Sequence, residues 1–299
     1  MLSEAQKALR RTGVGASECA AALGLSPYQT RFELYQVKRG EAPEPEENLA
    51  MRFGLAAEPF ILSEFQRAHP DDLLVVAPDT MRRGRLLAHL DAWVPGLYSV
   101  QAKTARTRQG WGESGSPDVP LHYLLQVQQE LLLAGVDVSF VPVLFGGADY
   151  DEFVVEADRE LQQLIEDGIA EFWVLVERGE PPEPVTLDDM LARFGHASRA
   201  DLVMADTDVL RAVHELRAIR AQRERLDAAE AALKARLMGV LGEADTLVDT
   251  TGHALATWRA VKPARRFDAA AFEAAHPELY REFLRTGEPS RQFRLKDEK

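Results

Sequence analysis

Three side chains that lie close together in the sequence have the right types to hold a divalent cation beside a lysine. Asp91 lies in one apolar run, and Gln101 and Lys103 lie in a second apolar run that follows a Pro-Gly break. Mg²⁺ prefers oxygen ligands, and a lysine beside a bound cation can contact a phosphate or orient an attacking water. This pattern indicates hydrolysis of phosphodiester bonds with Mg²⁺ or Mn²⁺ as the cofactor. We expect Asp91, the side-chain oxygen of Gln101 and the carbonyl of Ala102 to bind the ion.

Whether these side chains meet depends on the turn between the two runs. Side chains alternate along a strand, so positions 101 and 103 share a face. A three-residue turn centred on Gly96 pairs position 91 with position 101 and puts Asp91 on that face. A two-residue turn pairs position 91 with position 100 and puts Asp91 on the other face. The sequence leaves both registers open.

Glu58, on the helix expected before the sheet, is a further candidate ligand. A solvated helix glutamate is the alternative interpretation of this residue. Asp91 is more informative, because a charge inside the run Leu-Ala-His-Leu-Asp-Ala-Trp-Val is unfavourable unless it is paired or bound to a cation.

Hydrophobic periodicity predicts both helices and strands, which indicates an α/β (α+β) fold. A Pro-rich stretch at 181–184 divides this predicted domain, residues 1–182, from a C-terminal extension, residues 183–299. In the extension we expect a long charged helix, which is either a coiled-coil arm or a packed helix, then a β-hairpin and two short helices. We expect strands at 73–77, 86–94, 97–104, 138–145 and 151–155, and helices at 17–24 (with Ser17 as the N-cap), 26–39, 49–68, 120–134, 159–179 and 206–241.

Composition excludes several classes of protein. The net charge of −13 argues against attraction of nucleic acid over the whole surface, so any DNA contact needs a locally basic groove. The one cysteine excludes an internal disulfide and a multi-cysteine zinc site. No phosphate-binding loop of the G-x-x-x-x-G-K-[ST] type and no H-x-x-x-H spacing are present. With no apolar stretch long enough to cross a bilayer, we expect a soluble, cytoplasmic protein.

The order and spacing of several short motifs resemble the YqaJ-type viral recombinase family, relatives of phage lambda exonuclease within the PD-(D/E)XK nucleases, over about residues 10 to 180. The motifs are, in order, Gly13-Val14-Gly15 with Ser17; Leu23-Gly24 with Ser26-Pro27-Tyr28; Gly54 with Glu58-Pro59; Asp91; Val100 to Thr104; Trp111-Gly112; Pro120, Tyr123 and Gln126-Val127-Gln128; and Val143 to Gly147.

This resemblance implies a PD-(D/E)XK nuclease-like mixed sheet flanked by helices. For the activity, it implies Mg²⁺-dependent digestion of linear double-stranded DNA from the 5′ end, in phage-type recombination. It also implies a ring-shaped homotrimer, a single-strand annealing protein as partner, and a phage or prophage protein acting in the bacterial cytoplasm. By resemblance, Gln126 would lie near the metal. Arg10 or Arg11 with Ser17 would bind the terminal 5′-phosphate, as would Arg106 and Arg108. A serine hydroxyl and backbone N–H groups at a helix N-terminus, with arginines nearby, do bind anions well, although solvated surface charge is the alternative for each arginine.

Position 101 departs from the family pattern, in which this residue is usually glutamate. A neutral amide binds Mg²⁺ more weakly than a carboxylate does, so we expect low activity. The chain is then a natural glutamine variant that still cuts, a Glu-to-Gln variant made to trap uncut DNA, or a degenerate member that only binds. The alternative function is a catalytically impaired DNA-end-binding or assembly protein on the same fold.

Overall fold

The computed structural model describes residues 8–76, 79–196, 201–264, 267–285, 287 and 290–296. It divides into two compact units, Met1–Arg193 and Phe194–Lys299. The division thus falls after Arg193, beyond the Pro-rich stretch where the sequence analysis places it. No helix in the described ranges combines the length and the apolar character needed to span a membrane.

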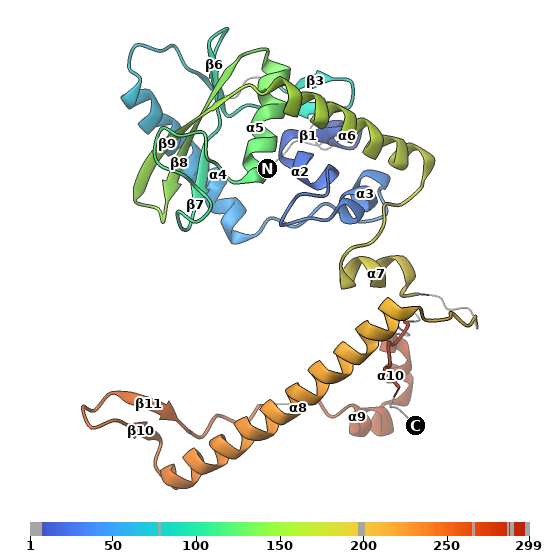
Figure 1. The fold of residues 1–299 in the computed structure, drawn as a ribbon. Coiled ribbons are helices and arrows are strands. Elements are labelled where there is room, and N and C mark those ends of the chain that lie inside the picture. Colours follow the sequence, from blue (N-terminus) through green and yellow to red (C-terminus); the bar gives the residue numbers. More distant parts are fainter. Residues whose placement is uncertain are drawn as a thin grey trace. The chain divides into compact units, whose positions relative to one another are not determined.

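The first unit is built on a mixed six-stranded sheet (Figure 1). Its strands run in the order β2-β5-β6-β8-β7, and β9 pairs with β8. β6 and β7 are parallel to β8, whereas β5 is antiparallel to β6 and β9 is antiparallel to β8. The bounds are β2 Val75–Val76, β5 Ala92–Val94, β6 Tyr98–Val100, β7 Lys103–Ala105, β8 Val138–Phe145 and β9 Asp149–Glu156.

A second, three-stranded sheet has the order β1-β4-β3. Its strands are β1 (Val14–Gly15), β3 (Met81–Arg83) and β4 (Leu86–Ala88). Gly13 is required next to this sheet, because a Cβ atom there would lie 2.5 Å from the backbone oxygen of Arg85.

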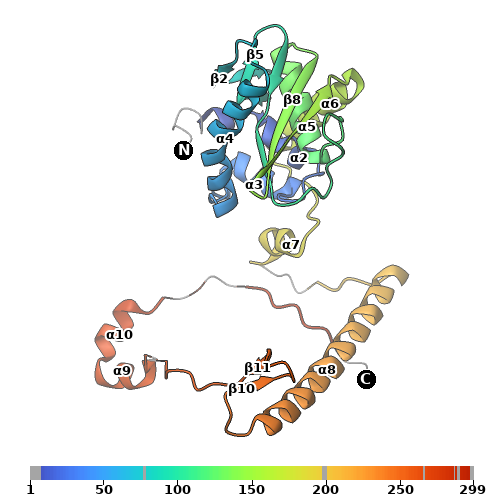
Figure 2. The same ribbon diagram turned by 90° about the vertical axis from the view of Figure 1, so that its left-hand side faces the viewer.

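Helices cover both faces of the larger sheet, as predicted (Figure 2). α4 packs against one face, around Val100, Ala102 and Leu144. α5 packs against the other face, around Val141 and Val143. The helical segments of this unit are η1 Ala16–Glu18, α2 Cys19–Ala22, α3 Arg31–Arg39, α4 Leu49–Ala68, α5 Leu121–Ala134, α6 Arg159–Arg178 and α7 Leu187–Phe194.

Two predicted strands are wrong in their extent. Residues 86–94 form two strands in different sheets, because β4 pairs with β1 and β3 whereas β5 pairs with β2 and β6. Asp91 therefore lies just before β5, outside a continuous strand. The expected strand at 97–104 is interrupted at 101–102, where the N–H of Ala102 donates to Asp91 and the facing residue of β8 is Pro142, which has no N–H. Of residues 73–77, only Val75–Val76 are strand, and residue 77 lies outside the described residues.

The helix starts near the N-terminus also differ from expectation. Ser17 is not an N-cap; it is an exposed residue inside η1, and the cap position is Gly15, whose N–H donates to the carboxylate of Glu18 (2.8 Å). α3 begins at Arg31 because Thr30 and Glu33 form a reciprocal capping box there.

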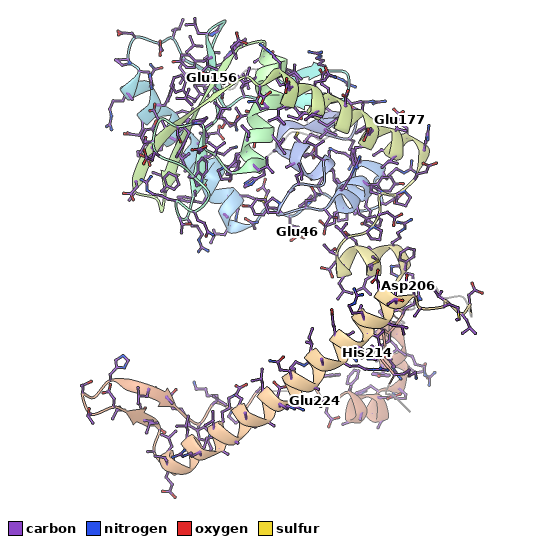
Figure 3. The ribbon with its side chains drawn as sticks, viewed as in Figure 1. Glu46, Glu156, Glu177, Asp206, His214 and Glu224 are labelled. Atoms are coloured by element: carbon purple, nitrogen blue, oxygen red, sulfur yellow. The ribbon has the colours of Figure 1, made fainter. Side chains whose placement is uncertain are left out.

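The second unit is a long helix with small appended elements. α8 (Thr207–Leu241) has Asp206 as its N-cap (Figure 3), and the Asp206 carboxylate accepts a hydrogen bond of 2.8 Å from the N–H of Val209. Within the described part of the second unit, only Leu241 of α8 is buried; whether the helix is a coiled-coil arm or a packed helix stays a prediction. The other elements are β10 Thr246–Val248, β11 Ala254–Thr257, α9 Ala269–Ala275 and α10 Pro277–Phe283.

Candidate active site

The hairpin of β5 and β6 has the register that brings Asp91 and Gln101 together. Ala92 pairs with Val100 and Val94 pairs with Tyr98, which leaves a three-residue turn at 95–97 with Gly96 at φ 75°. The same register extended by one residue sets position 91 opposite position 101. The three-residue turn is therefore confirmed, and the two-residue alternative is wrong.

The site faces α5. Val100 and Ala102 pack on the α4 side of the sheet, so their neighbours at 101 and 103 point to the other side. The pairing of β7 with β8 also places Lys103 on the α5 side of the sheet, because Lys103 pairs with Val143, which packs against α5. Asp91, Gln101 and Lys103 thus share the sheet face that α5 covers.

Asp91 is fixed by its neighbours across the hairpin. Its Oδ2 accepts a hydrogen bond from the N–H of Ala102 (2.8 Å). Burial raises the pKa of the Asp91 carboxyl to about 7 and the charge of Glu58 adds to this, whereas Lys103 and hydrogen bonds from Ala102 and Gln101 oppose it. A cation bound beside the Asp91 carboxyl would lower its pKa again and so favour the ionised form.

Glu58 lies on α4, the helix on the opposite face of the sheet, yet its charge affects Asp91. The helix comes close to β7 at Gly54, where a Cβ atom would lie 3.6 Å from the hydroxyl of Thr104. One turn later Glu58 is half-buried. The structure therefore brings Glu58, on α4, close enough to Asp91 for the two charges to interact.

Lys103 lies beside aromatic side chains of α5. Its Nζ is 5.2 Å from the ring centroid of Tyr123. Burial and the Lys103 charge both lower the pKa of His122, whose ring packs against Tyr123 and Tyr28. These aromatic groups hold the lysine on the α5 side of the sheet.

α5 adds an acidic residue that the sequence analysis missed. Gln126 donates from Nε2 to Oε1 of Glu130 (2.8 Å), and the side chains of both residues are buried. Burial raises the pKa of Glu130 to about 8, against the opposing charge of Lys103. The signal in the sequence is weak: Glu130 lies four residues after Gln126, which sets both side chains on one face of the helix, but an acid at that spacing is ordinary on an exposed helix. The neighbouring Gln128 and Gln129 instead bond backbone groups of the core.

The oxygen atoms in this site are ligands of the kind that a hard cation such as Mg²⁺ prefers. The carboxylate of Asp91 and the buried Oε1 of Gln101, which has no hydrogen-bond partner, are both oxygen ligands. In the described parts of the chain, no three His, Cys, Asp or Glu side chains gather closely enough to hold a metal ion. A site here would therefore depend on amide and backbone oxygens as well as on carboxylates.

The residues expected at a 5′-phosphate have mixed environments. Arg10 donates to Glu18 (2.7 Å), and the buried Lys38 donates to the same carboxylate (2.6 Å). Arg108 pairs with Asp151. The structure leaves Arg11, Ser17 and Arg106 exposed. η1, which contains Ser17, packs against α5.

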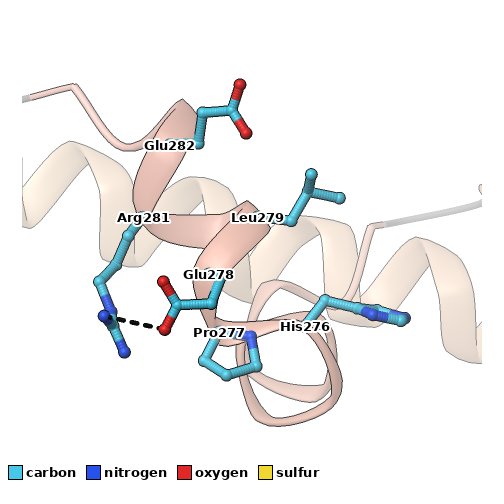
Figure 4. Close-up of a pocket in the computed structure, with 6 residues that line it drawn as sticks. All are labelled: His276, Pro277, Glu278, Leu279, Arg281 and Glu282. Atoms are coloured by element: carbon cyan, nitrogen blue, oxygen red, sulfur yellow. Dashed lines mark ion pairs between the residues drawn. The ribbon is translucent and has the colours of Figure 1, made fainter.

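The second unit has a shallow surface hollow of its own, lined by six residues of α10 and its N-cap position: His276, Pro277, Glu278, Leu279, Arg281 and Glu282 (Figure 4). One short helix supplies nearly all of it, and none of the predicted site residues contributes.

Comparison with known proteins agrees with the motifs. Residues 7–137 match the YqaJ-like viral recombinase domain. The chain is 27% identical over 172 residues to the uncharacterized protein YqaJ of Bacillus subtilis strain 168, which covers 55% of this chain and 53% of that protein. This chain therefore spans about half the length of its curated relative. The predicted likeness to the YqaJ-type family is confirmed for this part of the chain.

Two solved structures of similar fold are described as exonucleases. An alkaline exonuclease, LHK-Exo, from Laribacter hongkongensis has 17% identity and a TM-score of 0.49, covering 60% of this chain and 94% of that chain. A phage-related exonuclease from Haemophilus somnus 129PT has 11% identity and a TM-score of 0.42, covering 57% of this chain and 96% of that chain.

Proposed function

We propose that this chain, whose residues 7–137 match the YqaJ-like viral recombinase domain, is a metal-dependent exonuclease. It would digest linear double-stranded DNA from the 5′ end in phage-type recombination. The observation that carries the proposal is the convergence of Asp91, Gln101 and Lys103 on one sheet face. Both the β5–β6 register and the β7–β8 register support it.

In this mechanism three residues would hold the metal ion and a lysine would act on the water or the phosphate. Asp91, Oε1 of Gln101 and the carbonyl of Ala102 would hold Mg²⁺ or Mn²⁺, which when bound polarises the scissile phosphate. Lys103 orients the attacking water or contacts the phosphate being cut. Gln126, which donates to Glu130 on α5, would lie near the metal, and Glu58 would add negative charge from α4.

The direction of digestion would depend on recognition of the terminal phosphate. Ser17 lies in η1, which packs on α5, and Arg10 and Arg11 precede it in the sequence. Arg106 and Arg108 follow β7. For Arg10 and Arg108 a phosphate would compete with Glu18 and Asp151 for the guanidinium. A homotrimer, a single-strand annealing partner and action in the bacterial cytoplasm complete the proposal.

The test uses linear duplex DNA labelled at the 5′ or the 3′ end, with covalently closed circular DNA as the control substrate. With Mg²⁺ we expect early release of the 5′ label and no attack on the circle. Early release of the 3′ label would reverse the proposed polarity, and cleavage of the circle would contradict an exonuclease.

A second candidate function is a DNA-end-binding protein that does not cut. The neutral side chain at position 101 is the observation that favours it, because it leaves the site one carboxylate short of the family pattern. Binding of linear duplex without cutting in both Mg²⁺ and Mn²⁺ would favour this function.

A further inference from the structure

Glu130 is a buried acid with an unused oxygen. Its side chain is fully buried, and Oε1 accepts from Gln126 (2.8 Å). Oε2 is buried as well and has no hydrogen-bond partner in the part of the chain that the structure describes. An acid in this setting is unfavourable for stability unless a nearby positive charge or another polar group offsets it.

Glu130 faces the proposed cation site. Tyr123, Gln126 and Glu130 follow one another at helical spacing along α5, so they form one stripe on the helix. The Nζ atom of Lys103 lies over Tyr123 at one end of this stripe. The charges of Lys103 and Asp91 both act on Glu130 at the other end. The stripe therefore runs along the side of the sheet on which Asp91, Gln101 and Lys103 lie.

Two of the buried oxygens without a partner among the described residues are Oε1 of Gln101, on this face of the sheet, and Oε2 of Glu130, on the helix that covers it. One of them is neutral where the family pattern has a carboxylate. The other is an acidic group that no family motif identified in this sequence includes.

We propose that Glu130 supplies, from α5, the negative charge that position 101 lacks, so that a divalent cation is bound despite Gln101. Glu130 does this as a charge across the site, since no three acidic side chains of the described residues gather around one point. The inference rests on the proposed function, because it concerns the same cation site. The alternative is a protonated Glu130 that only completes the core through Gln126.

The experiment measures Mn²⁺ affinity of the full chain without DNA, by the electron paramagnetic resonance signal of free Mn²⁺. Glu130→Gln keeps the shape of the side chain and the bond to Gln126. We expect it to weaken Mn²⁺ binding on the order of 10- to 100-fold at an unchanged melting temperature. Gln101→Glu in the Glu130→Gln background should then bring the affinity back toward the wild-type value, whereas a core role predicts that Glu130→Gln alone leaves the affinity unchanged.

The matched control is Asp189→Asn. Asp189 is also a buried carboxylate, but it caps the start of α7 and bonds Thr30. Its loss should leave Mn²⁺ affinity unchanged. Should Glu130→Gln fail to fold, Glu130→Met, an apolar residue of similar size, is the second variant. A folded Glu130 variant that binds Mn²⁺ as the wild type does would overturn the inference.

Cutting of linear duplex, measured in parallel, separates this inference from the proposed function. A wild-type chain that never cuts, yet loses Mn²⁺ affinity in Glu130→Gln, would support the charge role and refute the nuclease. A wild type that cuts, with a Glu130→Gln variant equal in both affinity and rate, would refute the charge role alone.

Discussion

At the scale of single residues, position 101 decides how strongly the site can bind a cation. Its amide contributes a hydrogen bond to Asp91 and leaves Oε1 without a partner. A carboxylate in the same place would add a full negative charge to a partly buried site. Charge-assisted contacts are about twice as strong as neutral ones, so the exchange of a carboxylate for an amide at position 101 should weaken cation binding considerably.

Gln101→Glu should therefore increase the rate of duplex digestion. We expect at least about a tenfold gain, equivalent to about 1.4 kcal/mol of transition-state stabilisation. The measurement is nucleotide release from linear duplex at a Mg²⁺ concentration below saturation of the wild-type protein. Equal rates for the two proteins would remove the argument that the amide limits activity.

Lys103→Ala should abolish cutting and leave binding of duplex ends intact. The lysine lies within electrostatic range of Asp91 and over Tyr123, and the role proposed for it is in the chemical step rather than in DNA binding. Gel-shift titration with a linear duplex, next to the cleavage assay, measures both properties. Parallel loss of binding and cutting would show that the assigned role is wrong.

At the scale of elements, sequence periodicity predicted the helices better than the strands. The bounds of α4 and β8 agree with the predictions, since both have long, clear apolar patterns. The run at 86–94 is apolar except at His89 and Asp91, and these two polar residues were interpreted as part of one strand, so the change of sheet at residues 89–91 was not predicted. The sequence allowed a two-residue or a three-residue turn at Gly96, and only the observed pairing of β5 with β6 selects the three-residue turn.

The candidate site was predicted to a similar degree. Asp91, Gln101 and Lys103 were identified and do converge. Glu130 was missed because an acid at helical spacing is ordinary when the helix is exposed, and only the packing of α5 on the sheet shows that it is buried. The roles of the individual residues stay predictions.

The segment containing η1 depends on a buried ion pair. Burial alone would raise the pKa of Glu18, but Lys38 and Arg10 outweigh it and hold this pKa below its ordinary value. The ionised carboxylate therefore stabilises the fold above the unfolded-state pKa of about 4.3. This contribution is lost as the pH falls through the lower folded-state pKa.

Glu18→Gln should lower the free energy of unfolding by roughly 3 kcal/mol at pH 7, because it leaves Lys38 buried without its partner. The difference from wild type should shrink below about pH 4 as the wild-type carboxyl takes up its proton. Urea unfolding at several pH values measures it. Glu41→Gln, which removes an exposed pair with Arg39, is the control and should change little. A pH-independent loss would point to a packing defect instead.

At the scale of the whole molecule, the two units differ in how they are stabilised. The three clusters of buried apolar residues all lie in the first unit, from Val14 to Val176. Among the described residues of the second unit, Leu241 is the only buried apolar side chain. Along α8, apolar residues such as Leu226 and Leu233 are more than half exposed. Since burial of apolar surface is the main favourable contribution to folding, cooperative stability should reside in the first unit.

A fragment of residues 1–193 should therefore fold alone and show the main thermal transition of the full chain. Its melting temperature should lie within a few degrees of the full-length value, because a loss of about 1 kcal/mol shifts a domain of this size by about 2–4 °C. Differential scanning calorimetry of both proteins measures it. The fragment should also keep the Mn²⁺ affinity, since every proposed ligand lies before Arg193. An unfolded fragment would mean that the C-terminal unit contributes to the core of the first, and the boundary after Arg193 would then not separate independent folding units.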